Sequence, residues 1–349
     1  MTAPVKNGST GDGEGELPVL TKKDFTSDQE VRWCPGCGDY AILAQMQKML
    51  PELRIPRENI VFVSGIGCSS RFPYYLETYG FHSIHGRAPT LATGLKITRP
   101  ELSVFVITGD GDGLSIGGNH LLHAMRRNLD ITIVLFNNRI YGLTKGQFSP
   151  TSEMGKVTKS SPYGTTEAPL NPARIAIAAG ATFVARSVDR DTKHLEETLY
   201  RAAKHKGTSF VEVYQNCNIF NDGAFAAFAE KDVRADRMLY LEDGKPMRFG
   251  KHQEHGIRLE GFTPEVVHNA PDDEGLLIHD AGNPNTALAN MLIHMDYPDY
   301  PVPVGIIRQV ESPRFEELVQ HQVEDAKARS EPDFESLLRG PETWEVPAR

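Results

Sequence analysis

Short apolar runs alternate with amphipathic segments over the first two-thirds of the chain. Short runs that are rich in β-branched residues, several of them ended by Gly or Asn, predict buried parallel strands. Such strands are predicted at 59–64, 104–107, 131–136, 181–185 and 209–214. Apolar residues at helical spacing predict helices at 40–50, 90–97, 116–128, 172–179 and 191–204. Because strands and helices alternate, we expect an α/β fold with a mostly parallel, doubly wound sheet.

The pattern changes after about residue 225, where charged stretches separate short apolar runs. There we expect a strand at 274–279, a helix at 285–295, an edge strand at 304–307 and a charged helix at 316–329. Glycine, serine and acidic residues dominate the N-terminus, which predicts disorder. The expected division is a disordered tail, a main domain, a smaller C-terminal accessory region and a polar tail, at 1–24, 25–225, 226–320 and 321–349.

Candidate ligands for a metal follow two neighbouring predicted strands. A Gly-Asp-Gly-Asp-Gly motif at 109–113 follows the first strand, and Asn137-Asn138 ends the second. In parallel sheets, ligands bind at the carboxyl ends of the strands. Carboxylate and amide oxygens suit Mg²⁺, which keeps phosphate oxygens in its shell, and glycines let backbone N–H groups approach those phosphates. The sequence therefore predicts a diphosphate held by Mg²⁺.

The same stretch, Gly109 to Ile140, resembles the binding motif for thiamine diphosphate (ThDP), in which Asn-Asn follows Gly-Asp-Gly after about two dozen residues. This resemblance implies that Asp110, Asn138 and the backbone carbonyl of Ile140 hold Mg²⁺. The alternative is a pair of Asx-rich turns in an ordinary α/β sheet. Gly-Asp-Gly alone would favour that alternative, but Asn-Asn at this distance, with strands at both ends, favours the cofactor.

The sequence contains four cysteines, Cys34, Cys37, Cys68 and Cys217. The last two follow predicted strands, so the thiols can converge at one edge of the sheet. Disulfides are not expected in a cytoplasmic chain of this size. Structural zinc sites usually combine two Cys-x-x-Cys pairs, and only one is present. Four thiolates can also hold a [4Fe–4S] cluster. Spacing alone favours the cluster and zinc equally, with separate structural thiols as a third possibility.

Five motifs together resemble the β subunit of 2-oxoacid:ferredoxin oxidoreductases, especially that of 2-oxoglutarate:ferredoxin oxidoreductase. They are Cys-Pro-Gly-Cys-Gly at 34–38, Gly-Ile-Gly-Cys-Ser-Ser at 65–70, His-Gly-Arg-Ala at 85–88, Gly-Asp-Gly-Asp at 109–112 and Tyr-Gly-Leu-Thr-Lys-Gly-Gln at 141–147. They occur in the family's order within residues 30 to 225. The resemblance implies a ThDP-binding fold whose four cysteines carry a [4Fe–4S] cluster.

The resemblance also implies roles for further residues. Arg71 is placed near the substrate, where a guanidinium could hold a carboxylate bidentately, and Leu143 and Thr144 are placed in the substrate pocket. The implied cofactor-binding residues are Gly67, His85, Gly86, Arg87, Gly109, Asp110, Gly111, Asp112, Asn138 and Ile140. The structural alternatives are a surface salt bridge for Arg71 and a simple helix-entry role for residues 85–87.

The reaction implied by the resemblance is the oxidative decarboxylation of 2-oxoglutarate, or of other 2-oxoacids, with coenzyme A. It yields acyl-CoA and CO₂ and reduces ferredoxin. The glutamate that activates ThDP is expected from a partner α subunit, because the chain after the first domain is too short and irregular for a second α/β domain. The alternatives are a non-oxidative ThDP decarboxylase subunit with a structural metal site and a non-enzymatic iron–sulfur scaffold.

Composition narrows the class of protein only slightly. The chain has 349 residues, 40% hydrophobic and 24% charged, which is typical of a globular protein. Its net charge of -9 argues weakly against nucleic acid as a partner. No apolar run approaches the ~20 residues of a membrane helix, and the N-terminus has no signal-peptide pattern. We therefore expect a cytoplasmic protein without a membrane segment.

Overall fold

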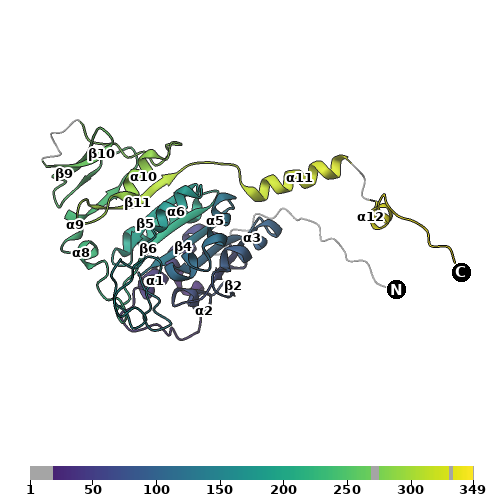
Figure 1. Ribbon diagram of the computed structural model, residues 1–349, viewed down its shortest axis with the longest axis horizontal. Coiled ribbons are helices and arrows are strands. Elements are labelled where there is room, and N and C mark those ends of the chain that lie inside the picture. The colour runs from purple at the N-terminus through teal and green to yellow at the C-terminus, as the bar shows by residue number, and fades with distance from the viewer. Residues whose placement is uncertain (1–18, 269–274, 330–332, 349) are drawn as a thin grey trace.

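The computed structural model describes residues 19–268, 275–329 and 333–348. Eight strands form one central sheet in the order β2-β1-β3-β4-β6-β5-β11-β7, and helices cover both faces (Figure 1). The strands are β1 (Ile60–Ser64), β2 (Tyr79–His82), β3 (Ser103–Gly109), β4 (Ile131–Asn137), β5 (Phe183–Val188), β6 (Ser209–Tyr214), β7 (Met238–Leu241) and β11 (Val302–Gln309). Neighbouring strands are parallel, except that β11 runs antiparallel to β5. The sheet confirms the predicted α/β fold with mostly parallel strands.

Two apolar clusters fill the space between the sheet and its helices. Val61 and Val63 belong to the first cluster and Phe62 to the second, because successive side chains of a strand point to opposite faces. The first cluster includes residues of α3 (Ala88–Thr98), α5 (Gly118–Arg126), α6 (Pro172–Ala178) and α10 (Ala287–His294). The second includes residues of α1 (Asp39–Met49) and α7 (Thr192–Lys204). These helices confirm those predicted from apolar spacing, with ends shifted by a few residues.

Shorter elements connect the main ones. The short helices are α2 (Phe72–Tyr75), α4 (Asp110–Leu114), α8 (Ala226–Ala229) and α9 (Arg234–Arg237). Single 3-10 turns occur at η1 (Lys22–Phe25), η2 (Leu50–Leu53), η3 (Arg57–Asn59) and η4 (Ser69–Arg71). The important one for the site is α4, because it begins at the residue that directly follows β3.

The region after residue 225 differs in part from the prediction. Strand β11 exists, but it lies between β5 and β7 and is not an edge strand, and β7 also joins the main sheet. Of the strand predicted at 274–279, Glu274 lies outside the described residues, and 275–279 form no strand; Ile278 makes one isolated bridge to Pro246. A separate antiparallel sheet consists of β8 (Arg248–Phe249), β9 (His255–Glu260) and β10 (Thr263–His268). This region therefore both extends the main sheet and adds a small sheet beside it.

The C-terminal segment leaves the body of the molecule. Helix α11 (Phe315–Arg329) confirms the predicted charged helix and projects outward, and α12 (Phe334–Arg339) lies beyond it in the predicted polar tail (Figure 1). Most of the predicted N-terminal disordered tail, residues 1–18, lies outside the described residues, whereas Lys22–Phe25 forms η1. Among the described helices, none has the length and apolar character needed to cross a membrane.

A buried ion pair joins β5 and β6 close to their carboxyl ends. Arg186 Nε donates to Glu212 Oε2 at 2.8 Å, and the two side chains are only 2% and 1% exposed. Glu212 Oε1 also accepts a hydrogen bond from Asn137 Nδ2 at 2.8 Å. The Arg186 guanidinium lies 5.2 Å from the ring centroid of Tyr214. Every charge of the pair thus has a partner, as burial of charge requires.

We expect Glu212→Ala to lower the free energy of unfolding by about 3–5 kcal/mol, because it leaves the Arg186 charge buried without a counterion. The control is Glu196→Ala. Glu196 pairs with Lys48 at 2.9 Å, but that pair is partly exposed, so its loss should cost at most about 1 kcal/mol. Urea denaturation of each variant measures the difference. Equal losses for the two variants would contradict the importance of the buried pair.

Candidate functional site

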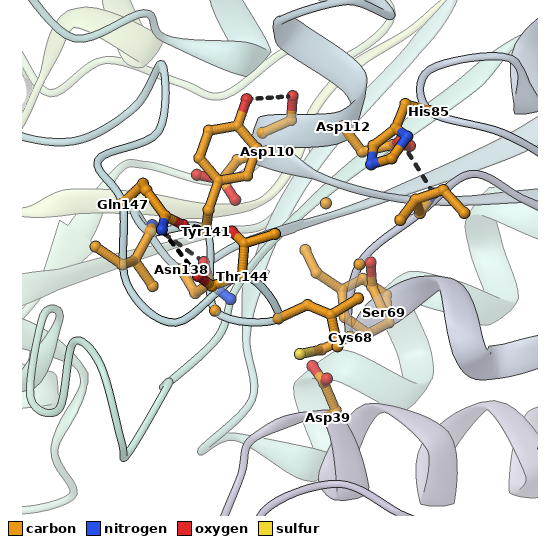
Figure 2. Close-up of a pocket in the computed structure, with 18 of the residues that line it drawn as sticks. Asp39, Cys68, Ser69, His85, Asp110, Asp112, Asn138, Tyr141, Thr144 and Gln147 are labelled. Atoms are coloured by element: carbon orange, nitrogen blue, oxygen red, sulfur yellow. Dashed lines mark hydrogen bonds between the residues drawn. The ribbon is translucent and has the colours of Figure 1, made fainter. Parts of the chain in front are cut away.

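A cavity of about 410 Å³ opens beyond the carboxyl ends of β1, β3 and β4 (Figure 2). The loop after β1, the first turn of α4 and the segment 138–147 after β4 form its walls. The predicted site residues that line it are Gly67, Cys68, His85, Gly109, Asp110, Gly111, Asp112, Asn138, Ile140, Leu143 and Thr144. The structure therefore brings most of the predicted cofactor and substrate residues around one space.

Asp110 is buried at the start of α4. Its Oδ2 accepts hydrogen bonds from Ser149 Oγ at 2.5 Å and from Thr151 Oγ1 at 2.6 Å. Burial raises the pKa of Asp110 above its usual value, although these two hydrogen bonds oppose the shift. Both hydroxyl groups bind the same carboxylate oxygen, so neither occupies Oδ1. The Ser/Thr-rich segment after residue 148 thus holds Asp110 in one orientation, a contact that the sequence did not reveal.

Asn138 and Ile140 follow β4 and line the same cavity. Asn138 Nδ2 donates to Gln215 Oε1 at 2.8 Å, whereas Asn138 Oδ1 accepts from the Ile140 backbone N–H at 3.1 Å. These bonds fix which end of the carboxamide carries the oxygen. Asp110, Asn138 and the Ile140 carbonyl can then offer oxygen ligands of the kind that Mg²⁺ prefers.

Asp112 has a connecting role in this geometry. Its Oδ1 accepts from the backbone N–H groups of Ile66 at 3.0 Å and Gly86 at 2.8 Å, and its Oδ2 accepts from Thr108 Oγ1 at 2.7 Å. It therefore ties the loop after β1 to the segment before α3. Gly86 has a φ of +66°, and a Cβ there would lie 2.4 Å from Gly117 Cα, so glycine is required at this crossing.

The predicted residues Gly86 and Arg87 lie beside the cavity and do not line it. Arg87 occupies the N-cap position of α3, and its Nη1 donates to the Ile116 carbonyl at 3.4 Å. The helix-entry interpretation of residues 85–87 therefore matches Arg87, whereas His85 faces the cavity.

Tyr141 covers the turn that begins α4. Its hydroxyl group donates to the Gly111 carbonyl at 3.1 Å, and a Cβ at Gly111 would lie 2.2 Å from the tyrosine ring. The ring thus requires glycine at position 111. Figure 2 shows Tyr141 beside Asp110 and Asn138 on one side of the cavity.

The four cysteines form no disulfide with one another and lie on three neighbouring loops. A Cβ at Gly142 would lie 3.5 Å from Cys217 Sγ and 3.8 Å from Cys68 Sγ, so both thiols face this residue. Hydrogen bonds join the loops: Gly38 N–H donates to the Asn216 carbonyl at 3.1 Å and Trp33 Nε1 to the Cys68 carbonyl at 2.8 Å.

The thiols influence one another electrostatically. Burial, followed by the nearby Asp39 and the Cys217 and Cys34 thiols, raises the pKa of Cys68 to about 12. Burial and Asp39, with smaller effects of Cys217 and Cys68, raise the pKa of Cys37 well above its usual value. The positive charge of a bound metal centre would favour the thiolate forms of Cys37 and Cys68.

No three His, Cys, Asp or Glu side chains in the described part of the chain are arranged to hold a metal ion. A cube of four irons and four sulfides holds its thiolates farther apart than one ion does. A [4Fe–4S] cluster and a zinc ion therefore place different demands on the spacing of four thiols.

Asp39 is a buried carboxylate that the sequence did not single out. It lines the cavity at the start of α1, next to Cys68 (Figure 2), and its Oδ2 has no hydrogen-bond partner. Burial, with a smaller effect of Asp189, raises the pKa of Asp39 to about 7. In the sequence, the one signal that could have indicated Asp39 as a site residue is its position two residues after Cys37.

Arg71 lies in a second cavity of about 410 Å³, which shares Ile66, Gly67 and Leu143 with the first. Its Nη1 donates to the Arg32 carbonyl at 3.2 Å. Across the described residues Arg71 forms no salt bridge, which disfavours the alternative of a surface ion pair. His82, which the sequence analysis missed, lines this second cavity as well.

Known proteins resemble this chain over most of its length. The family described as "Thiamine pyrophosphate enzyme, C-terminal TPP binding domain" matches residues 65–213; thiamine pyrophosphate is another name for ThDP. The "2-oxoglutarate oxidoreductase subunit KorB" of Mycobacterium tuberculosis is 51% identical over 99% of this chain and 98% of its own length. The chain belongs to the β-subunit family of 2-oxoacid:ferredoxin oxidoreductases.

Other members of the β-subunit family extend the comparison. The "2-oxoacid:ferredoxin oxidoreductase 1, subunit beta" of Aeropyrum pernix is 47% identical over 60% of this chain and 65% of its own length. A solved structure, "2-oxoglutarate:ferredoxin oxidoreductase from Magnetococcus marinus with 2-oxoglutarate, coenzyme A and succinyl-CoA bound", matches with a TM-score of 0.75 and 31% identity. That match covers 93% of this β subunit and 96% of the other chain. The predicted family, fold and oxidoreductase class are therefore confirmed.

Proposed function

We propose that this β subunit binds ThDP, Mg²⁺ and a [4Fe–4S] cluster. With an α subunit, it would convert 2-oxoglutarate and coenzyme A to succinyl-CoA and CO₂ while ferredoxin takes up two electrons. The observation that carries the proposal is the convergence of two ligand sets at one cavity. Oxygen donors from Asp110, Asn138 and Ile140 line it, and so does Cys68, one of the four grouped cysteines.

The proposed roles follow from the positions of the side chains. When bound, ThDP would supply a nucleophilic carbon for the 2-oxoacid and an electron sink for its decarboxylation. Asp110, Asn138 and Ile140 would hold Mg²⁺ and thereby fix the diphosphate. Cys34, Cys37, Cys68 and Cys217 would ligate the cluster. Apolar side chains that line the cavity, such as Ile116, Phe136 and Leu143, would keep water from the reacting atoms.

An α subunit is needed to complete the proposed site. Among the described residues, the acidic side chains that line the first cavity are Asp39, Asp110 and Asp112, and there is no glutamate. We propose that the activating glutamate comes from the α subunit, as a family of β subunits implies a heteromeric enzyme.

Arg71 is proposed to select the substrate. 2-Oxoglutarate has a second carboxylate that pyruvate lacks. The Arg71 guanidinium, in the second cavity next to the cofactor cavity, could bind this carboxylate. A hydrogen bond to a charged group contributes about 1.5–3 kcal/mol. We therefore expect Arg71→Leu to lower kcat/KM for 2-oxoglutarate about 10- to 100-fold, while any turnover of pyruvate changes much less.

Steady-state kinetics of the assembled α/β complex with both substrates test this prediction. The matched control is Arg32→Leu: Arg32 lines the same cavity, but its guanidinium already pairs with Glu30 at 3.1 Å, so its loss should matter less. Equal losses with 2-oxoglutarate and pyruvate would contradict a role of Arg71 in selectivity and would leave it as a general substrate anchor.

The proposed activity is tested with the α/β complex under anaerobic conditions. The expected result is reduction of ferredoxin that depends on both 2-oxoglutarate and coenzyme A, with formation of succinyl-CoA. Release of CO₂ without reduction of ferredoxin would contradict the oxidoreductase proposal and support a non-oxidative decarboxylase.

A further inference from the structure

Gln215 connects the two ligand sets of the site. It directly follows β6 and is only 1% exposed. Its Oε1 accepts a hydrogen bond from Asn138 Nδ2 at 2.8 Å, and its Nε2 lies 3.3 Å from Cys37 Sγ as a donor. Nε2 also donates to the Asn216 carbonyl at 2.6 Å. One side chain therefore touches both a candidate Mg²⁺ ligand and a candidate cluster ligand.

The neighbours of Gln215 determine which end of its amide faces which partner. The backbone N–H of Ile140 donates to Asn138 Oδ1 at 3.1 Å, so Asn138 presents its Nδ2 to Gln215. Gln215 must therefore accept this hydrogen bond with its Oε1. Its NH₂ group then points toward Cys37 and the Asn216 carbonyl. Its backbone is fixed as well, because Gln215 N–H donates to the Asn137 carbonyl at 2.9 Å.

We propose that Gln215 is a positioning residue with two functions. It keeps the carboxamide oxygen of Asn138 available to Mg²⁺, and it donates an amide hydrogen bond to the Cys37 thiolate of the cluster. The inference rests on the proposed function, because it requires both bound groups. It assigns to one residue an influence on cofactor affinity and on the reduction potential of the cluster.

Each function has a measurable consequence. Hydrogen bonds to the sulfurs of a cluster help to set its potential, and they favour the reduced form because it carries more negative charge. Loss of the amide should therefore make the potential more negative. Partners that orient a metal ligand typically contribute about 10- to 100-fold to metal affinity. Loss of the amide should also weaken the binding of ThDP with Mg²⁺ by about that factor.

The test compares the α/β complexes that contain Gln215→Leu and Gln47→Leu. Gln47 is also a buried glutamine, and it lies on α1. Its Nε2 donates to the Tyr75 carbonyl at 3.1 Å and not to a candidate ligand of Mg²⁺ or of the cluster. A redox titration followed by electron paramagnetic resonance gives the potential, and calorimetry with ThDP and Mg²⁺ gives the affinity. We expect a more negative potential and weaker binding only for Gln215→Leu.

An unchanged potential would overturn the role of Gln215 toward the cluster, and an unchanged affinity would overturn its role toward Asn138. Equal changes in the Gln47→Leu complex would overturn both. If the unaltered complex contained no iron and sulfide, the proposed function itself would fail, so the two failures are distinguishable.

A second measurement does not depend on the stability of a variant. In the unaltered α/β complex, selective ¹⁵N labelling of glutamine side chains should give a hyperfine coupling between one amide nitrogen and the reduced cluster. In the part of the chain that the structure describes, Gln215 is the glutamine that donates to a cysteine sulfur. Absence of this coupling in a complex with an intact cluster would overturn the hydrogen bond to Cys37.

Discussion

Replacement of Asp110 by alanine is expected to abolish the binding of ThDP and Mg²⁺ and to leave the iron–sulfur cluster in place. The carboxylate is proposed as a direct Mg²⁺ ligand, and Mg²⁺ usually has only one or two carboxylate ligands at phosphate sites. Residues that only orient a metal ligand typically contribute about 10- to 100-fold to metal affinity. The affinity for ThDP with Mg²⁺ should fall by more than that factor when the ligand itself is removed. The cysteines lie on other loops, so the iron and sulfide content should not change.

The matched control for this variant is Asp130→Ala. Asp130 is also mostly buried and pairs with Lys96 at 3.2 Å, but it lies just before β4, at the opposite end of that strand from Asn138. The Asp130→Ala variant therefore shows how much a general loss of stability affects ThDP binding when no proposed Mg²⁺ ligand is removed. Calorimetry with ThDP and Mg²⁺ measures both variants. Unchanged ThDP binding by the Asp110→Ala protein would refute the assignment of this residue to Mg²⁺.

Cys217→Ser is expected to lose or degrade the cluster, although Cys217 is far in sequence from the other cysteines. The chain has four cysteines, and a [4Fe–4S] cluster is usually held by four thiolates. Cys217 and Cys68 both face Gly142, so Cys217 belongs to the same group in space. Iron and sulfide analysis of the anaerobically purified complex, with spectra of the reduced cluster, measures the effect.

Ile219→Ser is the control for the cysteine variant. Ile219 lies on the same loop and is 56% exposed, so its replacement should change neither the iron content nor the spectrum. A stable cluster at full occupancy in the Cys217→Ser complex would mean that the fourth ligand comes from elsewhere, and the proposed ligand set would be wrong.

Local sequence patterns predicted the elements that have a clear periodicity. The buried runs that became β3, β4 and β6 and the amphipathic α7 were predicted because burial alone determines their pattern. Strand β2 was missed because its residues are exposed and form no apolar run. The position of β11 was wrong because its pairing with β5 and β7 depends on contacts between distant segments.

The candidate site was predictable only where neighbouring residues form a motif. The predicted oxygen donors lie within one βαβ unit, so their spacing placed them at one edge of the sheet. The hydrogen bonds of Ser149 and Thr151 to Asp110, and of Gln215 to Asn138 and Cys37, join distant residues, and no local pattern encodes them.

The directions of the side chains could not be predicted from the sequence either. Arg71 follows Cys68 closely, yet its side chain enters the second cavity, whereas Cys68 lines the first. The short 3-10 turn at Ser69–Arg71 sets these different directions, and spacing along the chain alone does not reveal it.

The most direct test of the central claim is a cofactor analysis of the β subunit purified anaerobically with its α subunit. We expect a brown complex with about one ThDP, about four iron atoms and about four sulfides per β subunit. A colourless complex that contains zinc in place of iron, or one that contains no ThDP, would contradict the claim that this cavity brings both groups together.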